Sequence, residues 1–308
     1  MRILIELPTW LGDAVMATPA IENLVNFQNE VEITLIGSFV SIEALKNHPK
    51  VIKTLVLDKK YTSLVKIVRE LGSFDTFFSF RNSFRAKFLK FLISAKNKHQ
   101  FNRNRYNNRH QVEKYNDFIN ESLNTNFPAG KLVLHTINST ISTDKLSLGI
   151  NPGASYGSAK RWYPQEFAQV AAELSSEYDI VIFGGPDEID IAKDIEKSLI
   201  EKGVTNYQNL VGKTTIVELI NQISSLDLFI TGDSGPMHIA AAFQVPTVAI
   251  FGPTRDDETS QWVNEKSIIV KKNLDCQPCM QRTCPLKHHN CMKLIKADDV
   301  LKAVRSVN

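Results

Sequence analysis

Two glycine-rich motifs that mark common phosphate-binding loops are missing from this sequence. Neither the Gly-x-Gly-x-x-Gly pattern of dinucleotide-binding folds nor the Walker loop with its lysine occurs in the 308 residues. Their absence argues against a dinucleotide-dependent redox enzyme and against a P-loop ATPase. Any phosphate site in the chain must therefore be built in another way.

Long apolar runs are also missing. No segment approaches the roughly 20 apolar residues that span a bilayer, and residues 1–7 look like a short buried strand rather than a signal peptide. Cysteine is scarce, and its four copies all lie between positions 276 and 291. We therefore expect a cytoplasmic protein whose cysteines stay reduced. The length and the hydrophobic fraction of 43% favour a soluble chain with two ordinary domains.

Acidic residues are nearly absent between Arg81 and Lys114. This basic stretch, 81–114, holds ten Lys or Arg residues and one acid, Glu113, although the whole chain carries a net charge of only +3. Aromatic residues are interleaved with the basic ones. A charge run is often a solvated face, but a run this long and one-signed favours an anionic partner. The leading candidates for its contacts are Arg81, Arg85, Arg103 and Arg105.

The first half of the chain alternates apolar strand-like runs with amphipathic segments of helical period. The expected strands are 2–7, 31–36, 51–57 and 74–80, and the expected helices are 14–26, 42–47, 61–71, 84–93 and 112–123. An Asn/Thr/Ser-rich stretch with weak periodicity, 124–144, suits a linker.

The second half starts the same alternation again. Its expected strands are 146–150, 180–183, 226–230 and 247–251, and its expected helices open at Pro164 and cover 188–201, 216–224 and 236–243. Strands that alternate with helices form a parallel sheet covered on both faces. We therefore predict an α/β protein with two Rossmann-like domains, 1–145 and 146–308, that face each other across a cleft. Ligands of such sheets bind beyond the carboxyl ends of the strands.

One segment of the second half joins a strand directly to a helix. It covers residues 231–238 and reads Thr-Gly-Asp-Ser-Gly-Pro-Met-His. A helix that opens in this way directs backbone N–H groups and a positive dipole end at one point. The segment predicts an anion site of the nucleotide-diphosphate type. His238 is either a packed, hydrogen-bonded residue of this segment or a phosphate contact.

Three further loops follow expected strands. Asp13 stands in a turn opened by Gly12; its spacing alone favours a helix cap, but a general base would occupy the same place. The loop 151–162 combines small residues with Ser155 and Lys160, which favours a phosphate contact over a plain surface loop. Glu188 could accept ribose hydroxyl protons, or it could be an acid favoured at a helix start.

The cysteines follow the spacing Cys276-x2-Cys279-x4-Cys284-x6-Cys291, with two histidines between the last two. Such spacing can hold a structural zinc ion. It departs from the usual paired Cys-x2-Cys knuckles, so a packed cluster of reduced thiols is the favoured interpretation. We predict no required metal or other cofactor.

Together these motifs resemble those of the lipopolysaccharide heptosyltransferases of glycosyltransferase family 9, and most of all the type that adds the second inner-core heptose. The resemblance covers the whole chain and rests on residues 11–13, 152–162, 233–238 and 279–285. It implies a GT-B fold with the acceptor in the first domain and ADP-heptose in the second. It also implies an inverting transfer of L-glycero-D-manno-heptose onto the first heptose of the lipopolysaccharide or lipooligosaccharide inner core.

The resemblance further implies roles for single residues. Asp13 would be the general base, and Lys160 would contact the diphosphate. The acceptor would be a lipid-anchored anionic oligosaccharide, which would explain the basic stretch and a peripheral contact with the inner-membrane surface; no nucleic acid would bind. The donor-binding set would be Thr9, Gly12, Ser155, Lys160, Glu188, Thr214, Asp233, Ser234, Gly235 and His238.

Two other functions stay open on the residues alone. A nucleotide-sugar epimerase has the same double-Rossmann layout, and a non-enzymatic nucleotide or nucleic-acid binding module could also carry a basic stretch. The binding module would not need an acid at Asp13 and would lose affinity steeply with salt. Release of sugar from ADP-heptose would separate the transferase from both.

Overall fold

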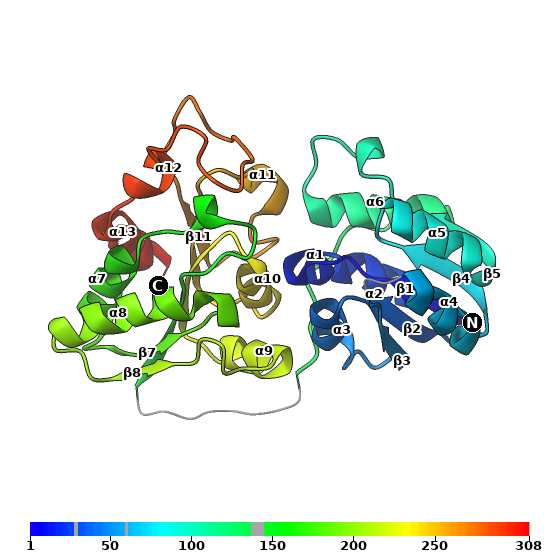
Figure 1. The fold of residues 1–308 in the computed structure, drawn as a ribbon, viewed down its shortest axis with the longest axis horizontal. Coiled ribbons are helices and arrows are strands. Elements are labelled where there is room, and N and C mark those ends of the chain that lie inside the picture. Colours follow the sequence, from blue (N-terminus) through cyan, green and yellow to red (C-terminus); the bar gives the residue numbers. More distant parts are fainter. Residues whose placement is uncertain (28–29, 59–60, 137–144, 308) are drawn as a thin grey trace. The chain divides into compact units, whose positions relative to one another are not determined.

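The computed structural model describes residues 1–27, 30–58, 61–136 and 145–307. The chain forms two compact units, Met1–Ile137 and Asn138–Asn308. Each unit is an open sheet of parallel strands with helices on both faces (Figure 1). The predicted α/β class and the two parallel-sheet domains are therefore confirmed. The boundary expected after residue 145 comes directly after residues 137–144, which lie outside the described part of the chain.

Unit 1 has the strand order β3-β2-β1-β4-β5. Its central strands are almost continuously apolar because both faces of the sheet are covered. The strands are β1 (Arg2–Glu6), β2 (Glu32–Gly37), β3 (Val51–Val56), β4 (Ser73–Ser79) and β5 (Ser94–Gln100); the helices are α1 (Leu11–Met16), α2 (Thr18–Phe27), α3 (Phe39–Leu45), α4 (Tyr61–Leu71), α5 (Phe84–Leu92), the 3₁₀ turn η1 (Arg103–Arg105) and α6 (Gln111–Leu123).

The two faces of this sheet carry different helices. On one face α4 and α5 pack together, and Leu4, Phe77 and Leu89 lie in the core beneath them. On the other face α1, α2, α3 and α6 contact one another. Successive side chains of a strand point to opposite faces, so the buried apolar residues of β1 supply both cores.

Three expectations for unit 1 need correction. The helix predicted over 14–26 is two helices, because Pro19 has no N–H and its ring disfavours a continuous helix at this point. The linker predicted over 124–144 is packed on unit 1 at least as far as Leu134, which is buried; the carbonyl of Phe127 accepts hydrogen bonds from α6. β5 was not predicted, because its sequence is polar and it lies at the edge of the sheet.

Unit 2 has the strand order β11-β10-β9-β6-β7-β8. Helices α7, α8 and α13 pack on one face and α9 and α10 pack together. The strands are β6 (Leu146–Asn151), β7 (Tyr178–Ile182), β8 (Tyr207–Asn209), β9 (Leu228–Gly232), β10 (Thr247–Ile250) and β11 (Ser267–Val270); the helices are α7 (Pro164–Leu174), α8 (Ile189–Glu201), α9 (Ile216–Ser224), α10 (Gly235–Ala242), α11 (Asp256–Thr259), α12 (Asn290–Lys293) and α13 (Ala297–Val307), with 3₁₀ turns η2 (Ser158–Lys160) and η3 (Pro186–Glu188).

The sequence patterns missed both edge strands of this sheet, β8 and β11, the two four-residue helices α11 and α12, and the C-terminal helix α13. The predicted elements are otherwise present, with bounds that differ by a few residues. β6 lies between β9 and β7, and β9 lies beside β10, so the loops that follow these four strands emerge at one edge of the sheet. Within the described residues, no helix is long and apolar enough to cross a membrane.

Candidate active site

Asp13 lies in the first turn of α1, just beyond the carboxyl end of β1. The helix begins after Trp10, whose side chain makes no capping hydrogen bond, and Asp13 is the third residue of the helix. The sequence-based preference for Asp13 as the helix cap is therefore wrong. Thr9 and Gly12 share this turn; Thr9 is exposed and Gly12 is half-buried. An acid in a first helical turn is stabilised by the helix dipole, which favours its charged form.

Tyr115 of α6 holds Asp13. Its hydroxyl donates a hydrogen bond to Oδ1 of Asp13 at 3.3 Å. Tyr115 is buried, and burial together with the charge of Asp13 raises the pKa of its hydroxyl well above the usual value; Arg103 opposes this shift. Tyr115 therefore stays protonated and able to donate over the physiological pH range. No sequence signal identified Tyr115, because 102 residues separate it from Asp13.

A buried carboxylate lies next to this turn at the end of β1. Glu6 is fully buried, accepts a hydrogen bond of 2.6 Å from the Ser79 hydroxyl of β4, and has an Arg81 guanidinium nitrogen 3.6 Å away. Desolvation raises its pKa above 4.5, although Ser79, Arg81 and Arg85 oppose the shift. Arg81 and Arg85 therefore both lie near Glu6 at the end of β1, close enough together to take part in one site. Arg85 also donates to the backbone carbonyl of Asp58.

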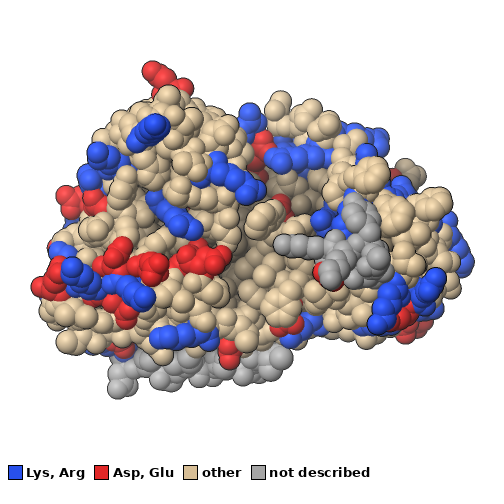
Figure 2. Space-filling model, viewed as in Figure 1, with Lys and Arg blue, Asp and Glu red and all other residues tan. Residues whose placement is uncertain are grey.

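The basic stretch is not one open positive surface. Arg105 contacts Glu121 at 3.3 Å, and Arg109 contacts both Glu113 and Asp117. Lys114 is buried, and Lys96 pairs with Asp75. On the face seen in Figure 2, Lys and Arg side chains lie on both units, and most of the Asp and Glu side chains in view lie on unit 2. The basic stretch keeps an excess of positive charge, but at least four of its ten Lys and Arg residues, among them Arg81, form an ion pair with an acid.

In unit 2, the start of α10 has the form that the sequence predicted. Ser234 is the N-cap residue, but its side chain makes no capping hydrogen bond. Its hydroxyl instead lies 3.2 Å from both Asn151 Nδ2 and Thr231 Oγ1. No side chain caps the backbone at this helix start, which leaves the Gly235 N–H for an anion; Pro236 has no N–H, and the N–H of Met237 donates to the Ser234 carbonyl at 3.2 Å. His238 follows in the first turn and is buried.

Lys160 is held beside this helix start by Asp233. The ammonium nitrogen lies 2.5 Å from Oδ2 of Asp233, and both side chains are largely buried. The hydroxyl of Thr254, in the loop after β10, donates to the same carboxylate oxygen at 2.6 Å. Sequence analysis missed Thr254, because nothing in its loop marks it. The result is one cation fixed next to an uncapped helix N-terminus.

Tyr156 completes the surroundings of Lys160. Its ring lies 4.7 Å from the lysine nitrogen, and the Arg282 guanidinium stacks on it at 5.4 Å. Its hydroxyl donates to the carbonyl of Met280 at 2.6 Å. A side chain at Gly157 would collide with the backbone of Arg282, so this position requires glycine. The loop 152–162 is thus packed against residues 280–282.

The remaining donor candidates lie on neighbouring loops. Glu188 is buried, and its carboxylate accepts the N–H of Gly185 at 2.7 Å; burial raises its pKa. This contact fits the helix-start interpretation and also fastens the loop after β7, because Gly153 packs directly on the same carboxylate. Ser155 is exposed, and Thr214 is half-buried just before α9.

Two clusters contain metal-ligating residue types. In unit 1, the ligand atoms of Glu22, His48 and His135 lie within 4.8 Å of one another. His48 already donates from Nε2 to Glu22 at 3.0 Å, since its Nδ1 accepts the N–H of Lys50. That tautomer opposes metal binding through Nε2. In unit 2, the four cysteines are all free thiols.

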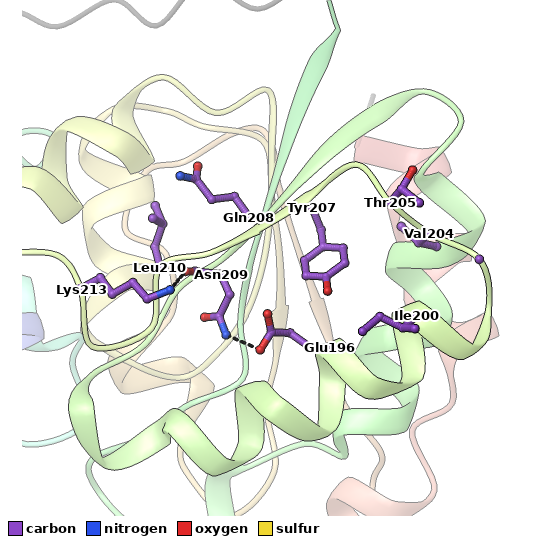
Figure 3. A pocket seen from close by; sticks show the side chains of 10 residues that line it. Glu196, Ile200, Val204, Thr205, Tyr207, Gln208, Asn209, Leu210 and Lys213 are labelled. Atoms are coloured by element: carbon purple, nitrogen blue, oxygen red, sulfur yellow. Dashed lines mark hydrogen bonds between the residues drawn. The ribbon is translucent and has the colours of Figure 1, made fainter.

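A broad depression in unit 2 lies apart from these residues. It has a volume of about 630 Å³ and is lined by residues of α8 and the β8 region. Figure 3 shows that its polar groups satisfy one another: Asn209 donates to Glu196 at 2.7 Å, and Lys213 donates to the carbonyl of Asn209 at 2.8 Å. None of the predicted site residues lines it.

Comparison with known proteins agrees with this description. Residues 66–290 match the model of glycosyltransferase family 9 (heptosyltransferase). Over its full length the chain is 43% identical to lipooligosaccharide heptosyltransferase 2 of Campylobacter jejuni, covering 98% of that protein. Its fold is similar to Escherichia coli ADP-heptose lps heptosyltransferase II, with a TM-score of 0.82, 20% identity and coverage of 100% of this chain and 98% of that one. Escherichia coli heptosyltransferase WaaC with ADP gives a TM-score of 0.80 at 16% identity, with full coverage of both chains.

The chain belongs to glycosyltransferase family 9, the heptosyltransferase family. It is a glycosyltransferase, and its pair of parallel-sheet units is the GT-B class of fold. The expected family and fold class are confirmed. The residues alone left the epimerase and the binding module open. Membership of this family supports the glycosyltransferase instead of either alternative.

Proposed function

We propose that this protein transfers a heptose from ADP-heptose to the first heptose of a lipopolysaccharide or lipooligosaccharide inner core, with inversion at the anomeric carbon. The observation that carries the proposal is the uncapped start of α10 beside the Lys160–Asp233 pair. A helix N-terminus with an adjacent fixed cation suits a nucleotide diphosphate. The names of the relatives that match over the full chain support the choice of sugar and acceptor.

In this proposal Asp13 is the general base. Its carboxylate takes the proton of the acceptor hydroxyl as that oxygen bonds to the anomeric carbon of the donor. The bond from this carbon to the diphosphate oxygen breaks at the same time, and ADP leaves with the electron pair. Tyr115 keeps the Asp13 side chain oriented through its hydrogen bond. Asp13 lies in the first turn of α1, where a helix dipole stabilises a negative charge.

Unit 2 stabilises the leaving group. Negative charge grows on the diphosphate as the sugar departs, and Lys160 and the backbone N–H of Gly235 meet it without further reorganisation. Asp233 and Thr254 fix the lysine in place beforehand. Ser155, Glu188, Thr214 and His238 complete the donor site in unit 2, and Thr9 and Gly12 are the donor-binding residues of unit 1.

The acceptor binds unit 1 through arginines of the basic stretch. Arg81 and Arg85 lie near the end of β1, and Arg103 lies close enough to Tyr115 to oppose the rise in its pKa. Arg105 is on the same short turn as Arg103, and its side chain is 68% exposed. These guanidinium groups suit the phosphates and carboxylates of an inner-core oligosaccharide.

Helix α5 supports a peripheral contact with the cytoplasmic face of the inner membrane. Phe84 and Phe91 are 79% and 80% exposed and lie seven residues apart, hence on one side of the helix. The exposed Lys87 lies between them on that side. Aromatic rings that enter the interface next to a cation match an anionic membrane surface, where the lipid-anchored acceptor is held.

The activity is tested with purified protein, ADP-heptose and two acceptors. One acceptor ends at the first inner-core heptose, and the other lacks it. We expect the first acceptor to gain the mass of one heptose with release of one ADP, and the second to remain unmodified. Equal use of both acceptors would contradict the assigned acceptor, and no product with either would contradict the proposed reaction.

A further inference from the structure

The four cysteines surround one small enclosed cavity in unit 2. Cys276, Cys279, Cys284 and Cys291 all line it, together with Ala159 and Pro253. Its volume is about 20 Å³, which is close to the space of a single water molecule. The residues between 273 and 289 form no helix or strand, so no backbone ladder holds this Cys-rich segment in shape. Thiols that are 3 to 15 positions apart in the chain are therefore gathered at one point by an irregular segment.

The donor set at this cavity favours thiolates over imidazoles. His289 uses both ring nitrogens, since Nε2 lies 2.9 Å from the carbonyl oxygen of Ala159 and Nδ1 lies 3.2 Å from the Tyr163 hydroxyl. His288 accepts the N–H of Asn290 with Nδ1 at 3.0 Å. His289 is thus engaged through both ring nitrogens, and His288 through one of them. The four cysteines supply the four sulfur ligands of a closed, structural tetrahedral site.

The Cys-rich segment also braces the loops that carry the donor site. Ala159, the residue before Lys160, makes two hydrogen bonds to this part of the chain. Its N–H donates to the carbonyl of Arg282 at 3.0 Å, and its carbonyl oxygen lies 2.9 Å from Nε2 of His289. On the other side, Gln277 donates to the carbonyl of Gly252 at 2.6 Å, and the N–H of Met280 donates to the carbonyl of Pro253 at 2.9 Å. The segment therefore fastens together the loops of Lys160 and Thr254.

We propose that Cys276, Cys279, Cys284 and Cys291 bind one structural metal ion of the zinc type, which keeps the loops of Lys160 and Thr254 in register. This goes beyond the preference for a thiol cluster that the spacing alone gave. The sulfurs are not among the groups of ligand atoms within 4.8 Å of one another, so binding turns the thiol side chains inward to the ~2.3 Å metal–sulfur distance. Each thiol gives up its proton to solvent on binding, so affinity falls as pH falls.

The test measures metal on the whole protein, purified under reducing conditions. We expect about one equivalent of zinc by elemental analysis, which a thiol-modifying mercurial releases into a chromogenic chelator. Growth with cobalt should give the visible bands of a tetrahedral ion together with a thiolate-to-cobalt band in the near ultraviolet. Absence of bound metal, with four thiols that react freely, would overturn the proposal. A cobalt spectrum without the thiolate band would overturn it too, since it would place the metal at nitrogen and oxygen ligands.

Variants locate the ion. Cys276→Ser, at a half-exposed position, should lower the metal content from about one equivalent to near none. His288 lines the same cavity, and the His288→Ala variant should keep its bound metal. His48→Gln, in the other cluster, should keep it as well. Loss of metal in His288→Ala or His48→Gln, but not in Cys276→Ser, would contradict the assignment of ligands.

The consequence for the donor loops rests on the proposed function and has its own readout. Removing the metal should weaken ADP binding measured by calorimetry, while acceptor binding to unit 1 is unchanged. Metal bound by a protein that transfers no heptose would contradict only the proposed reaction. Heptose transfer by a metal-free protein with intact ADP affinity would contradict only the role of the metal.

Discussion

The Tyr115 hydroxyl donates a hydrogen bond to Oδ1 of Asp13 across a distance of 3.3 Å, and this contact joins α6 to α1 at the end of β1. Burial and the Asp13 charge keep Tyr115 protonated, so the donor never competes for the proton that Asp13 accepts. The aromatic rings of Phe80 and Phe101 pack on Tyr115 and restrict its movement. The proposed base is therefore oriented by a buried aromatic cluster rather than by a surface loop.

Replacing Asp13 by Asn should abolish most turnover. The amide cannot accept the acceptor proton, and a positioned general base contributes ~10²–10⁴-fold in rate. We expect kcat to fall by that factor while ADP-heptose affinity, measured by calorimetry, stays near the wild-type value. Asp75→Asn, an acid at the opposite end of β4 that pairs with Lys96, is the matched control and should keep full activity. A wild-type kcat in Asp13→Asn would exclude the base role.

Replacing Lys160 by Ala should impair use of the donor. A charge-assisted contact contributes about 1.5–3 kcal/mol, which corresponds to roughly 10–150-fold in kcat/KM for ADP-heptose. Lys197→Ala removes an exposed lysine of α8 and should change neither constant. Lys160→Ala leaves Asp233 without its ionic partner and could therefore destabilise the fold. Thermal unfolding of both variants separates a loss of stability from the loss of a donor contact. Unchanged donor kinetics in folded Lys160→Ala would remove Lys160 from the donor site.

The arginine pair on η1 should act on the acceptor alone. For Arg103→Ser with Arg105→Ser we expect a higher KM for the acceptor and an unchanged Kd for ADP. The effect should shrink as salt rises, because the screening length falls to about 8 Å at physiological ionic strength. Arg109→Ser is the control, since Arg109 is already engaged by Glu113 and Asp117. A fall in donor affinity would place these arginines elsewhere.

The exposed rings of α5 should carry membrane binding. We expect wild-type protein to sediment with vesicles that contain phosphatidylglycerol and to bind phosphatidylcholine vesicles much less. Each ring removed, as Phe84→Ser or Phe91→Ser, should weaken binding by about 1.5–3 kcal/mol if it is fully inserted. Ile200→Ser, a 63% exposed apolar residue of unit 2, should bind like wild type. Equal binding by all variants would exclude α5 as the contact.

Glu6 should make the stability of unit 1 depend on pH in an unusual direction. Its pKa in the folded protein is raised above 4.5 by burial, so between the unfolded and folded pKa values the native state holds more protons. The contribution of Glu6 to stability is therefore present below pH 4.5 and is lost as the pH rises through the folded pKa. Urea unfolding at several pH values should show wild type losing stability relative to Glu6→Gln as pH increases. The opposite trend would mean that Ser79 and Arg81 outweigh desolvation.

Local sequence patterns predicted most of the secondary structure of this protein. The alternation of apolar strands with amphipathic helices predicted both parallel sheets, because a buried parallel strand must be almost continuously apolar. The position of Lys160, Asp233 and Ser234 after predicted strands also placed them correctly in loops at the carboxyl edge of one sheet. Edge strands such as β5 and β8 escaped prediction because one side has no neighbouring strand and their side chains are polar.

Sequence alone determined which segments become strands, helices and anion-binding turns, since these follow from the periodicity and turn chemistry of a few consecutive residues. Only the tertiary structure decided what each functional side chain touches. Tyr115 reaches Asp13, Thr254 reaches Asp233, and Arg282 reaches Ala159 from positions 21 to 123 residues away in the chain. Such partners are chosen by sheet order and helix packing, which no local pattern encodes, and they decide whether a carboxylate caps a helix or stands ready to take a proton.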